Sequence, residues 1–419
     1  MPTATVNEEH SSPTRTLTDK EARMPLHIGF ARQAITPSLS QPVYMAGFAQ
    51  NRLAQSVHDD LWVCALALEV GQKRVVLAAL DLIGLPRVHV LEIERRLTER
   101  VPGTGLLLAC THNHNGPDTI GLWGPDYATP GTDPQYLAWL KERVLESLLA
   151  ALERMQPAQM RATATHVAGV ARNARDPHIV DDELTCLQFC RPQDGATLLT
   201  LLVFPCHPEL LWEHNQAISA DYVGFVRLQV EEQTGAPCLF LVGALGGMMT
   251  PATDEHTFEE AARMGATLAR AGLTALAPTP CLEVHHLEHL RREVSVPMTN
   301  PLFQMALAAG LLPGETASEG EVTTEINLLK VGPAWFAGVP GELLPKLGLE
   351  VKALLRQAGA EVAGVIGLVN DEVGYILPPE EFVYPDDPFQ PGSHYEETMS
   401  LGPETAPRLL TALKEVANA

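Results

Sequence analysis

The sequence predicts an α/β (or α+β) protein, a large single domain in which mixed β-sheets are flanked by helices. Short apolar runs bounded by turn residues alternate with longer amphipathic segments along most of the 419 residues. Neither an internal repeat nor a low-complexity linker marks a domain boundary. Polar residues follow the ends of several predicted strands, where ligand sites of α/β proteins gather.

The first half of the chain is predicted to alternate between strands and helices. Two apolar runs flank Gly71-Gln72-Lys73, which is typical of a hairpin. The predicted elements are, in order, strand 28–34, strands 61–70 and 74–80, helix 89–100, strand 105–109, helix 136–155 and strand 160–169.

The second half continues the same alternation. The predicted elements are strands 184–191 and 197–204, helix 220–233, strand 237–242, helix 258–275, strand 285–296, strands 325–331 and 334–338, helix 344–358, strand 362–369 and helix 407–416. Breaks at Gly, Pro and Ala-Ala positions predict that residues 300–320 form a mobile insertion.

The amino terminus is polar and rich in Ser and Thr, so we expect residues 1–24 to be a disordered leader. It has no apolar segment of the kind found in secretory signals, and no stretch of the chain has the length of a transmembrane helix. We therefore expect a cytoplasmic protein whose domain covers residues 25–419.

Composition narrows the possible partners. Lys and Arg total 29 against 51 Asp and Glu, a formal net charge of −22, which disfavours nucleic acids and anionic lipid surfaces. The seven cysteines include no C-x-x-C pair and indicate buried, reduced thiols. Cys110 and Cys206 lie close to candidate metal ligands, so contact with a metal is a secondary interpretation. The oligomeric state does not follow from the sequence.

The strand 105–109 ends in the segment Thr111-His112-Asn113-His114, around which the chain is organised. Residues two apart in extended chain point the same way, so both imidazoles leave one side of the strand end. Neutral imidazole is a preferred zinc ligand. An isolated H-x-H motif is also compatible with two ordinary loop histidines. His285, His286 and His289 lie in a charged, alternating stretch and are expected to be solvated.

Further polar landmarks also follow predicted strands. They are His207, the glycine-rich segment Gly243–Gly247, Glu342 and Tyr375. Each has an ordinary structural explanation, since Glu342 opens a helix and the glycines can form a tight turn. Two histidines, one glutamate and one more oxygen donor nevertheless make a suitable open zinc shell. No G-x-S-x-G motif is present, which disfavours a serine hydrolase.

From His27 onward the sequence resembles the catalytic domain of neutral/alkaline non-lysosomal ceramidases. The segment Thr111-His112-Asn113-His114-Asn115-Gly116-Pro117 is similar to the family's T-H-T-H-S-G-P block. The remaining similar blocks are Ala34–Pro37, Val57–Leu61, Leu80–Leu82, Cys206-His207 through Asp221, Val339–Glu342, Gly367 through Tyr375, and Glu380–Phe382.

The resemblance implies a zinc-dependent amidohydrolase of lipid, or sphingolipid, metabolism that acts on a small N-acyl amide or lipid-like substrate. His112, His207, Glu342 and Tyr375 would hold Zn²⁺, and His114 would be a catalytic acid/base beside the metal. Tyr375 would also take part in catalysis. Zinc in such a site activates water and polarises the carbonyl, while a histidine moves the proton.

The sequence departs from the family pattern at two places. Thr250 follows Gly247-Met248-Met249 where ceramidases have a serine, and the family's Asn-Arg segment reads Asn173-Ala174-Arg175. The substrate-binding arginine is therefore absent or shifted to Arg175. These departures leave two alternatives, a zinc-dependent esterase or lactonase and a metal-retaining binding protein without turnover.

Overall fold

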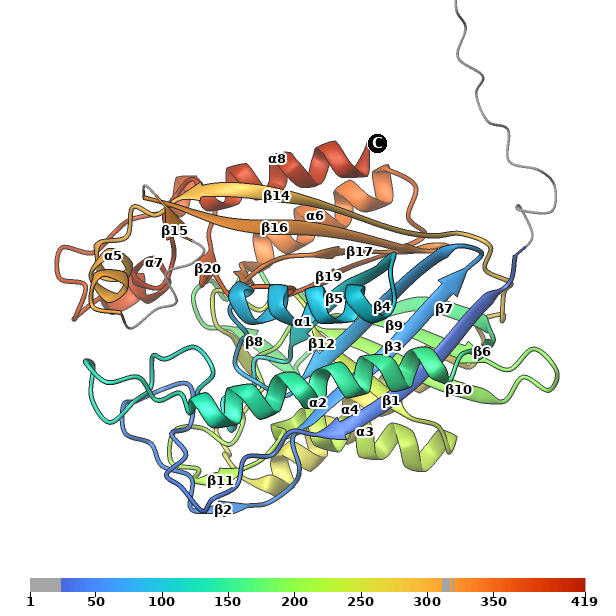
Figure 1. Cartoon of the computed structure of the whole chain (residues 1–419), viewed down its shortest axis with the longest axis horizontal. Coiled ribbons are helices and arrows are strands. Elements are labelled where there is room, and N and C mark those ends of the chain that lie inside the picture. Colours follow the sequence, from blue (N-terminus) through green and yellow to red (C-terminus); the bar gives the residue numbers. More distant parts are fainter. Residues whose placement is uncertain (1–23, 311–316, 319, 419) are drawn as a thin grey trace, which may run out of the picture.

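The computed structural model describes residues 24–310, 317–318 and 320–418 of the chain (Figure 1). In this part of the chain, three large sheets face one shared buried core and carry helices on their outer sides. The leader predicted for residues 1–24 lies outside the described residues, apart from Met24. The mixed α/β fold class is confirmed.

The first sheet has the order β5-β4-β3-β1-β6 and holds the H-N-H segment. Its members are β1 (Leu26–Ala34), β3 (Trp62–Val70), β4 (Lys73–Leu80), β5 (Thr104–Cys110) and β6 (Gln156–Pro157). The predicted hairpin is confirmed, because β3 pairs antiparallel with β4. Helices α1 (Arg87–Arg100) and α2 (Pro134–Glu153) cover its outer side.

Both faces of this first sheet are buried, which explains its long apolar runs. Along β3, Val63, Ala65 and Ala67 pack towards the helices. The alternate residues of the same strand, among them Leu66 and Leu68, pack into the core shared by the three sheets.

The second sheet has the order β12-β10-β9-β7. Its members are β7 (Gln159–His166), β9 (Glu183–Cys190), β10 (Thr197–Phe204) and β12 (Cys238–Val242), and it is covered by α3 (Asp221–Thr234) and α4 (Phe258–Leu276). The third sheet has the order β14-β16-β17-β19, with the short β15 (Ala317–Ser318) on β16. Its members are β14 (Leu287–Pro297), β16 (Glu321–Val331), β17 (Ala334–Gly338) and β19 (Val362–Ile366), covered by α6 (Pro345–Gln357) and α8 (Thr405–Ala417).

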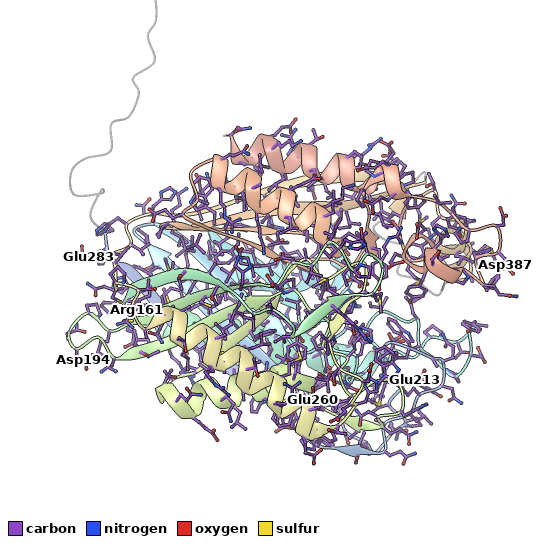
Figure 2. All side chains as sticks on the ribbon, turned by 180° about the vertical axis from the view of Figure 1, so that it is seen from behind. Arg161, Asp194, Glu213, Glu260, Glu283 and Asp387 are labelled. Atoms are coloured by element: carbon purple, nitrogen blue, oxygen red, sulfur yellow. The ribbon has the colours of Figure 1, made fainter. Side chains whose placement is uncertain are left out.

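Each sheet contains one parallel pair joined through a helix, and these pairs bring the site together. The units are β4-α1-β5, β10-α3-β12 and β17-α6-β19. Parallel strands end at the same edge of a sheet, so each unit places two carboxyl ends side by side. Figure 2 shows the direction of β10, which begins after Asp194 at one end of the molecule and is followed by Glu213 at the other.

Three short ladders tie the loops at this end of the molecule. They are β2 (Ser56–Val57) with β11 (Ala217–Ile218), β8 (Ala171–Asn173) with β13 (Met249–Pro251), and β18 (Glu342–Leu343) with β20 (Tyr375–Ile376). The remaining elements are α5 (Pro301–Ala308), α7 (Tyr395–Thr398) and the 3₁₀ turns η3 (Pro379–Glu381) and η4 (Gly392–His394).

Two sequence-based expectations differ from the structure. The proposed insertion at 300–320 contains helix α5, which Asn300 caps by accepting from the backbone N–H of Leu302 (2.9 Å). Residues 311–316 and 319 lie outside the described part. His289 is half-buried, since it packs against Gly105 of β5 and its Nε2 lies 2.9 Å from Asn327 Oδ1.

All seven cysteines are unpaired, and all except Cys281 are buried, as predicted. No helix in the described ranges is long and apolar enough to cross a bilayer.

Candidate active site

The H-N-H segment leaves the carboxyl end of β5 and turns sharply at His112. Its φ of 60° lies in the left-handed region, which is uncommon for a residue other than glycine and is often found at functional sites. The backbone N–H of Asn113 donates to Leu82 O (3.0 Å), and its side-chain amide donates to Ser219 O (2.9 Å). These bonds hold the two histidines in place.

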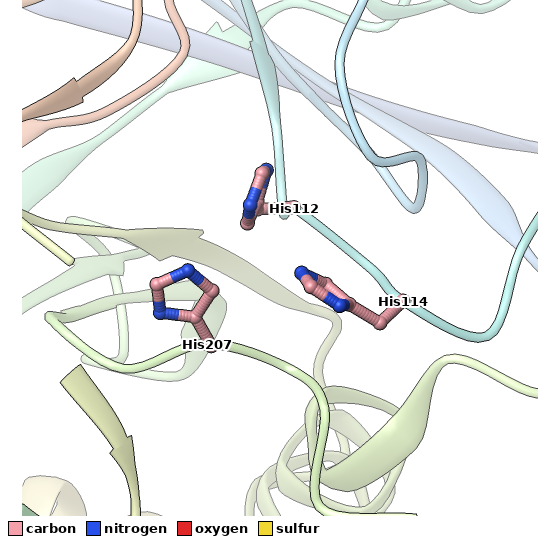
Figure 3. A group of neighbouring side chains, drawn as sticks. All are labelled: His112, His114 and His207. Carbon is pink, nitrogen blue, oxygen red and sulfur yellow. The ribbon is translucent and has the colours of Figure 1, made fainter. Parts of the chain in front are cut away.

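The structure brings His112, His114 and His207 together from two sheets (Figure 3). Each offers one ring nitrogen, and these three nitrogens lie within 4.8 Å of one another. All three residues are buried, and their ring centroids are 5.0–5.6 Å apart. A group of this kind can hold a metal ion.

Glu342 joins the cluster from the third sheet. Its Oε2 lies 3.0 Å from His207 Nε2 and 3.3 Å from His112 Nε2. Two donors on a tetrahedral metal with bonds of about 2.1 Å would be about 3.4 Å apart, close to these separations. The histidines of the H-N-H segment and the distant Glu342 therefore lie at one site.

The other ring nitrogens of these two histidines show that the site suits a cation. His112 Nδ1 lies 2.7 Å from Ile83 O, and His207 Nδ1 lies 2.9 Å from Met249 O. A carbonyl only accepts, so each Nδ1 donates a hydrogen, and each Nε2, an acceptor when its ring is neutral, faces the carboxylate of Glu342. Three acceptors meeting without a donor require either an added proton or a metal ion.

The electrostatics of the cluster agree with this reading. Burial alone would lower the pKa of His207, but the negative charges of Glu209 and Glu342 and its hydrogen bonds raise it to about 9. Burial would raise the pKa of Glu342, yet the charges and hydrogen bonds of His112 and His207 hold it at about 2. The site thus stabilises positive charge next to an ionised carboxylate.

Glu342 and Tyr375 are register partners in the short parallel ladder of β18 and β20. Tyr375 lies in the cavity wall with its hydroxyl donating to Met248 Sδ at 3.2 Å. Burial raises the pKa of Tyr375 well above its usual value, so the phenol stays protonated.

The backbone of Gly246 packs directly against the backbone of Glu342. Only glycine permits this close approach, because a Cβ at position 246 would lie 2.4 Å from Glu342 O. The glycine-rich strand end therefore supports Glu342.

Sequence reasoning missed Glu209, which is fully buried beside His114. Its Oε2 lies 3.5 Å from His114 Nδ1. Within the described residues, neither carboxylate oxygen of Glu209 and neither ring nitrogen of His114 has a hydrogen-bond partner. A carboxylate at this position orients an imidazole and favours one tautomer. The available signal was an acidic residue inside the otherwise apolar stretch that follows His207.

A cavity that is open to solvent lies above the cluster. His112, His114 and Glu342 lie in its wall, together with Tyr375. Most of the remaining wall is apolar, including Phe48, Ile83, Ile120, Leu122, Trp123, Phe303, Leu307 and Met399. Such a cavity suits a ligand with a hydrocarbon portion and few polar groups.

Residues 26–239, just over half of the chain, match the profile of the amino-terminal region of neutral/alkaline non-lysosomal ceramidases. The chain belongs to this family. Family membership and fold together indicate a hydrolase. A search of curated proteins gave no significant match.

Solved ceramidases have the same fold over nearly the whole chain. Neutral ceramidase from Pseudomonas aeruginosa superposes with a TM-score of 0.78 at 18% identity, covering 95% of this chain and 74% of that one. A ceramidase complexed with C2 superposes with a TM-score of 0.78 at 19% identity, covering 95% of this chain and 75% of that one.

Several residues that match ceramidase motifs form buried contacts next to the site. Asp81 forms a buried two-bond ion pair with Arg227 at 2.6 and 2.8 Å and also accepts from the N–H of Trp62. Asn370 accepts from the N–H of Leu108 at 2.7 Å and so joins the third sheet to β5. These contacts fix the relative positions of strand ends that carry the candidate ligands.

Arg175 has a structural partner in place of an open pocket. Its guanidinium binds Glu397 and Glu396 of α7 at 2.9 Å each. The hydrogen bonds that Arg175 donates to Glu397, together with the negative charges of Glu396 and Glu397, raise the pKa of Arg175. Arg175 thereby holds α7, which borders the cavity, and neither it nor Ala174 nor Thr250 lies in the cavity wall among the described residues.

Proposed function

We propose that the chain is a zinc-dependent hydrolase that cleaves the amide bond of an N-acyl substrate. The observation that supports this most is the meeting of His112, His207 and Glu342 around one point at the base of an apolar cavity. We assign these three as metal ligands with Tyr375 as the fourth. The unpaired cysteines support our prediction of a reducing compartment.

Zinc bound by these residues would polarise the amide carbonyl and make a water molecule more acidic. The protein would supply the remaining functions. The apolar wall would hold the acyl chain and exclude bulk water, which strengthens electrostatic interactions inside the cavity.

Proton transfer is assigned to His114. Burial, followed by the nearby His112 and His207, lowers its pKa well below the usual value, so the ring is unprotonated, which is the form that a general base requires. Glu209 lies on its Nδ1 side, which leaves Nε2 to take a proton and pass it to the departing amine. The phenol of Tyr375 would donate to the oxygen of the carbonyl as negative charge develops there.

A substrate panel tests the proposed reaction and its alternatives. Protein loaded with zinc is assayed on matched N-acyl amides, esters and lactones, with ceramide and short N-acyl amides compared directly. We expect amide cleavage that a chelator abolishes, with short N-acyl amides preferred over ceramide because Arg175 is held by Glu396 and Glu397 and the described cavity wall has no arginine to bind a head group. Faster ester or lactone cleavage would favour the first alternative, and no turnover with retained zinc would favour the binding protein.

Replacing Tyr375 by Phe should keep zinc and the fold while lowering turnover roughly a hundredfold or more, since it removes one transition-state donor. The ring remains in its buried position, and three ligands still hold the metal. Metal content, melting temperature and kcat are measured together. Tyr44→Phe, outside the cavity wall, is the matched control. An unchanged kcat in Tyr375→Phe would remove this residue from the site.

Zinc affinity should rise with pH, because His207 must lose a proton before it can bind metal. With its pKa at about 9, each pH unit between 6 and 8 should tighten zinc binding roughly tenfold. Titrations against a chromophoric chelator at several pH values measure this slope. Proton release in weakly buffered solution is the independent check, and an affinity independent of pH would contradict the assigned protonation.

A further inference from the structure

Glu372 is a carboxylate in the cavity wall that the proposed reaction does not use. Its Oε1 accepts from the backbone N–H of Gly374 at 3.0 Å. Its Oε2 is shielded from solvent and has no hydrogen-bond partner among the described residues. One oxygen is therefore fixed by the backbone, and the other is available to a ligand.

The surroundings of Glu372 place it close to the metal cluster. A Cβ on Gly84 would lie 2.8 Å from Glu372 Cγ and 3.0 Å from Ile120 Cδ1, so Glu372 packs directly against the backbone at Gly84. Gly84 follows Ile83, whose carbonyl binds His112. A group that contacts Glu372 would accordingly lie near the amide bond, at the junction with the apolar wall.

The described part of the cavity wall provides no Lys or Arg partner for Glu372. The neighbouring Asp371 and Glu342 are also acidic. A buried carboxylate oxygen without a hydrogen-bond partner is unfavourable, so a ligand that donates to Oε2 is favoured.

We propose that Glu372 recognises a hydrogen-bond donor, a hydroxyl or a protonated amine, that the substrate carries close to its amide bond. The proposal rests on the proposed function for the position of the amide. The substrate class is then an N-acyl amide with an apolar chain and one donor near the scissile bond, and Glu372 is its specificity-determining residue.

The test is equilibrium binding of ketone analogues, in which a methylene replaces the amide nitrogen so that hydrolysis is excluded. Four probes carry a hydroxyl, an ammonium, a methoxy or a methyl group at the same position, on the amine side in one set and on the acyl side in another. Wild type loaded with zinc should bind the hydroxyl or ammonium probe roughly tenfold more tightly than the methoxy and methyl probes. The tighter of the two identifies the donor.

The variant Glu372→Gln has a specific expected result. Its amide oxygen would accept from Gly374 and its NH₂ group would occupy the position of Oε2, so the free position becomes a donor. The ammonium probe should lose its advantage, and the methoxy probe should bind as tightly as the hydroxyl probe. Glu372→Met should bind all four alike, and melting temperatures verify that both variants are folded.

Equal binding of the four probes to wild type, or an unchanged donor preference in Glu372→Gln, would overturn the proposal. Because binding is measured without turnover, this result is separate from the proposed reaction. A donor preference without amide hydrolysis would support the role of Glu372 and contradict the proposed hydrolase activity. Amide hydrolysis without a donor preference would support the hydrolase activity and contradict the role of Glu372.

Discussion

His207→Ala should remove zinc from the protein and abolish amide hydrolysis. His207 is fully buried, its Nε2 faces Glu342 at 3.0 Å, and two remaining strong ligands rarely retain zinc. We expect stoichiometric zinc in wild type, less than about a tenth of that in the variant, and turnover lowered roughly a thousandfold or more. Metal analysis after gel filtration, together with kcat on a short N-acyl amide, measures both effects.

The matched control for this variant is His214→Ala. His214 lies on the same loop, but its side chain is 92% exposed and faces the exposed Glu213. It should keep zinc and turnover at the wild-type level. Full zinc occupancy in folded His207→Ala would show that the metal binds elsewhere.

His114→Ala should retain zinc but lose roughly a hundredfold or more in turnover, the usual scale for a general acid/base. A competing arrangement uses all three histidines as metal ligands, since a ring nitrogen of His114 lies within 4.8 Å of those of His112 and His207. If the three histidines were the ligands, His114→Ala would lose metal as His207→Ala does. Zinc content therefore distinguishes the two arrangements before activity is considered.

Glu209→Gln provides the companion variant for His114. If Glu209 orients His114, the variant should keep zinc and shift the pH dependence of kcat, because the charge beside the imidazole is removed. A loss of activity with an unshifted pH profile would indicate a packing role for Glu209 instead.

The arrangement of strands and helices was predictable because each apolar run carries its own boundary residues. The hairpin of β3 and β4 and the helix α2 match the predicted ranges closely. The site was partly predictable for the same reason, since His112, His207 and Glu342 each follow a strand that ends at one edge of the molecule. Because parallel strands end at the same edge of a sheet, residues that follow the ends of such strands also lie close together in space.

Other features depend on contacts between distant segments, which no local pattern contains. The partner of Arg175 lies on α7, more than two hundred residues away, so its interpretation as a substrate-binding residue was open in the sequence. Glu209 and Glu372 stand out because their buried oxygens lack partners, a property of the folded chain. Helix α5 was missed because Ala and Gly residues around it suggested breaks, whereas the cap at Asn300 starts a helix.

The most direct test of the central claim is zinc-edge anomalous diffraction from crystals grown with zinc. We predict one strong peak bonded to His112 Nε2, His207 Nε2, Glu342 Oε2 and the hydroxyl oxygen of Tyr375, with His114 beyond bonding distance. A peak bonded to His114 in place of Glu342, or no peak in the cavity while the protein hydrolyses N-acyl amides, would contradict the account.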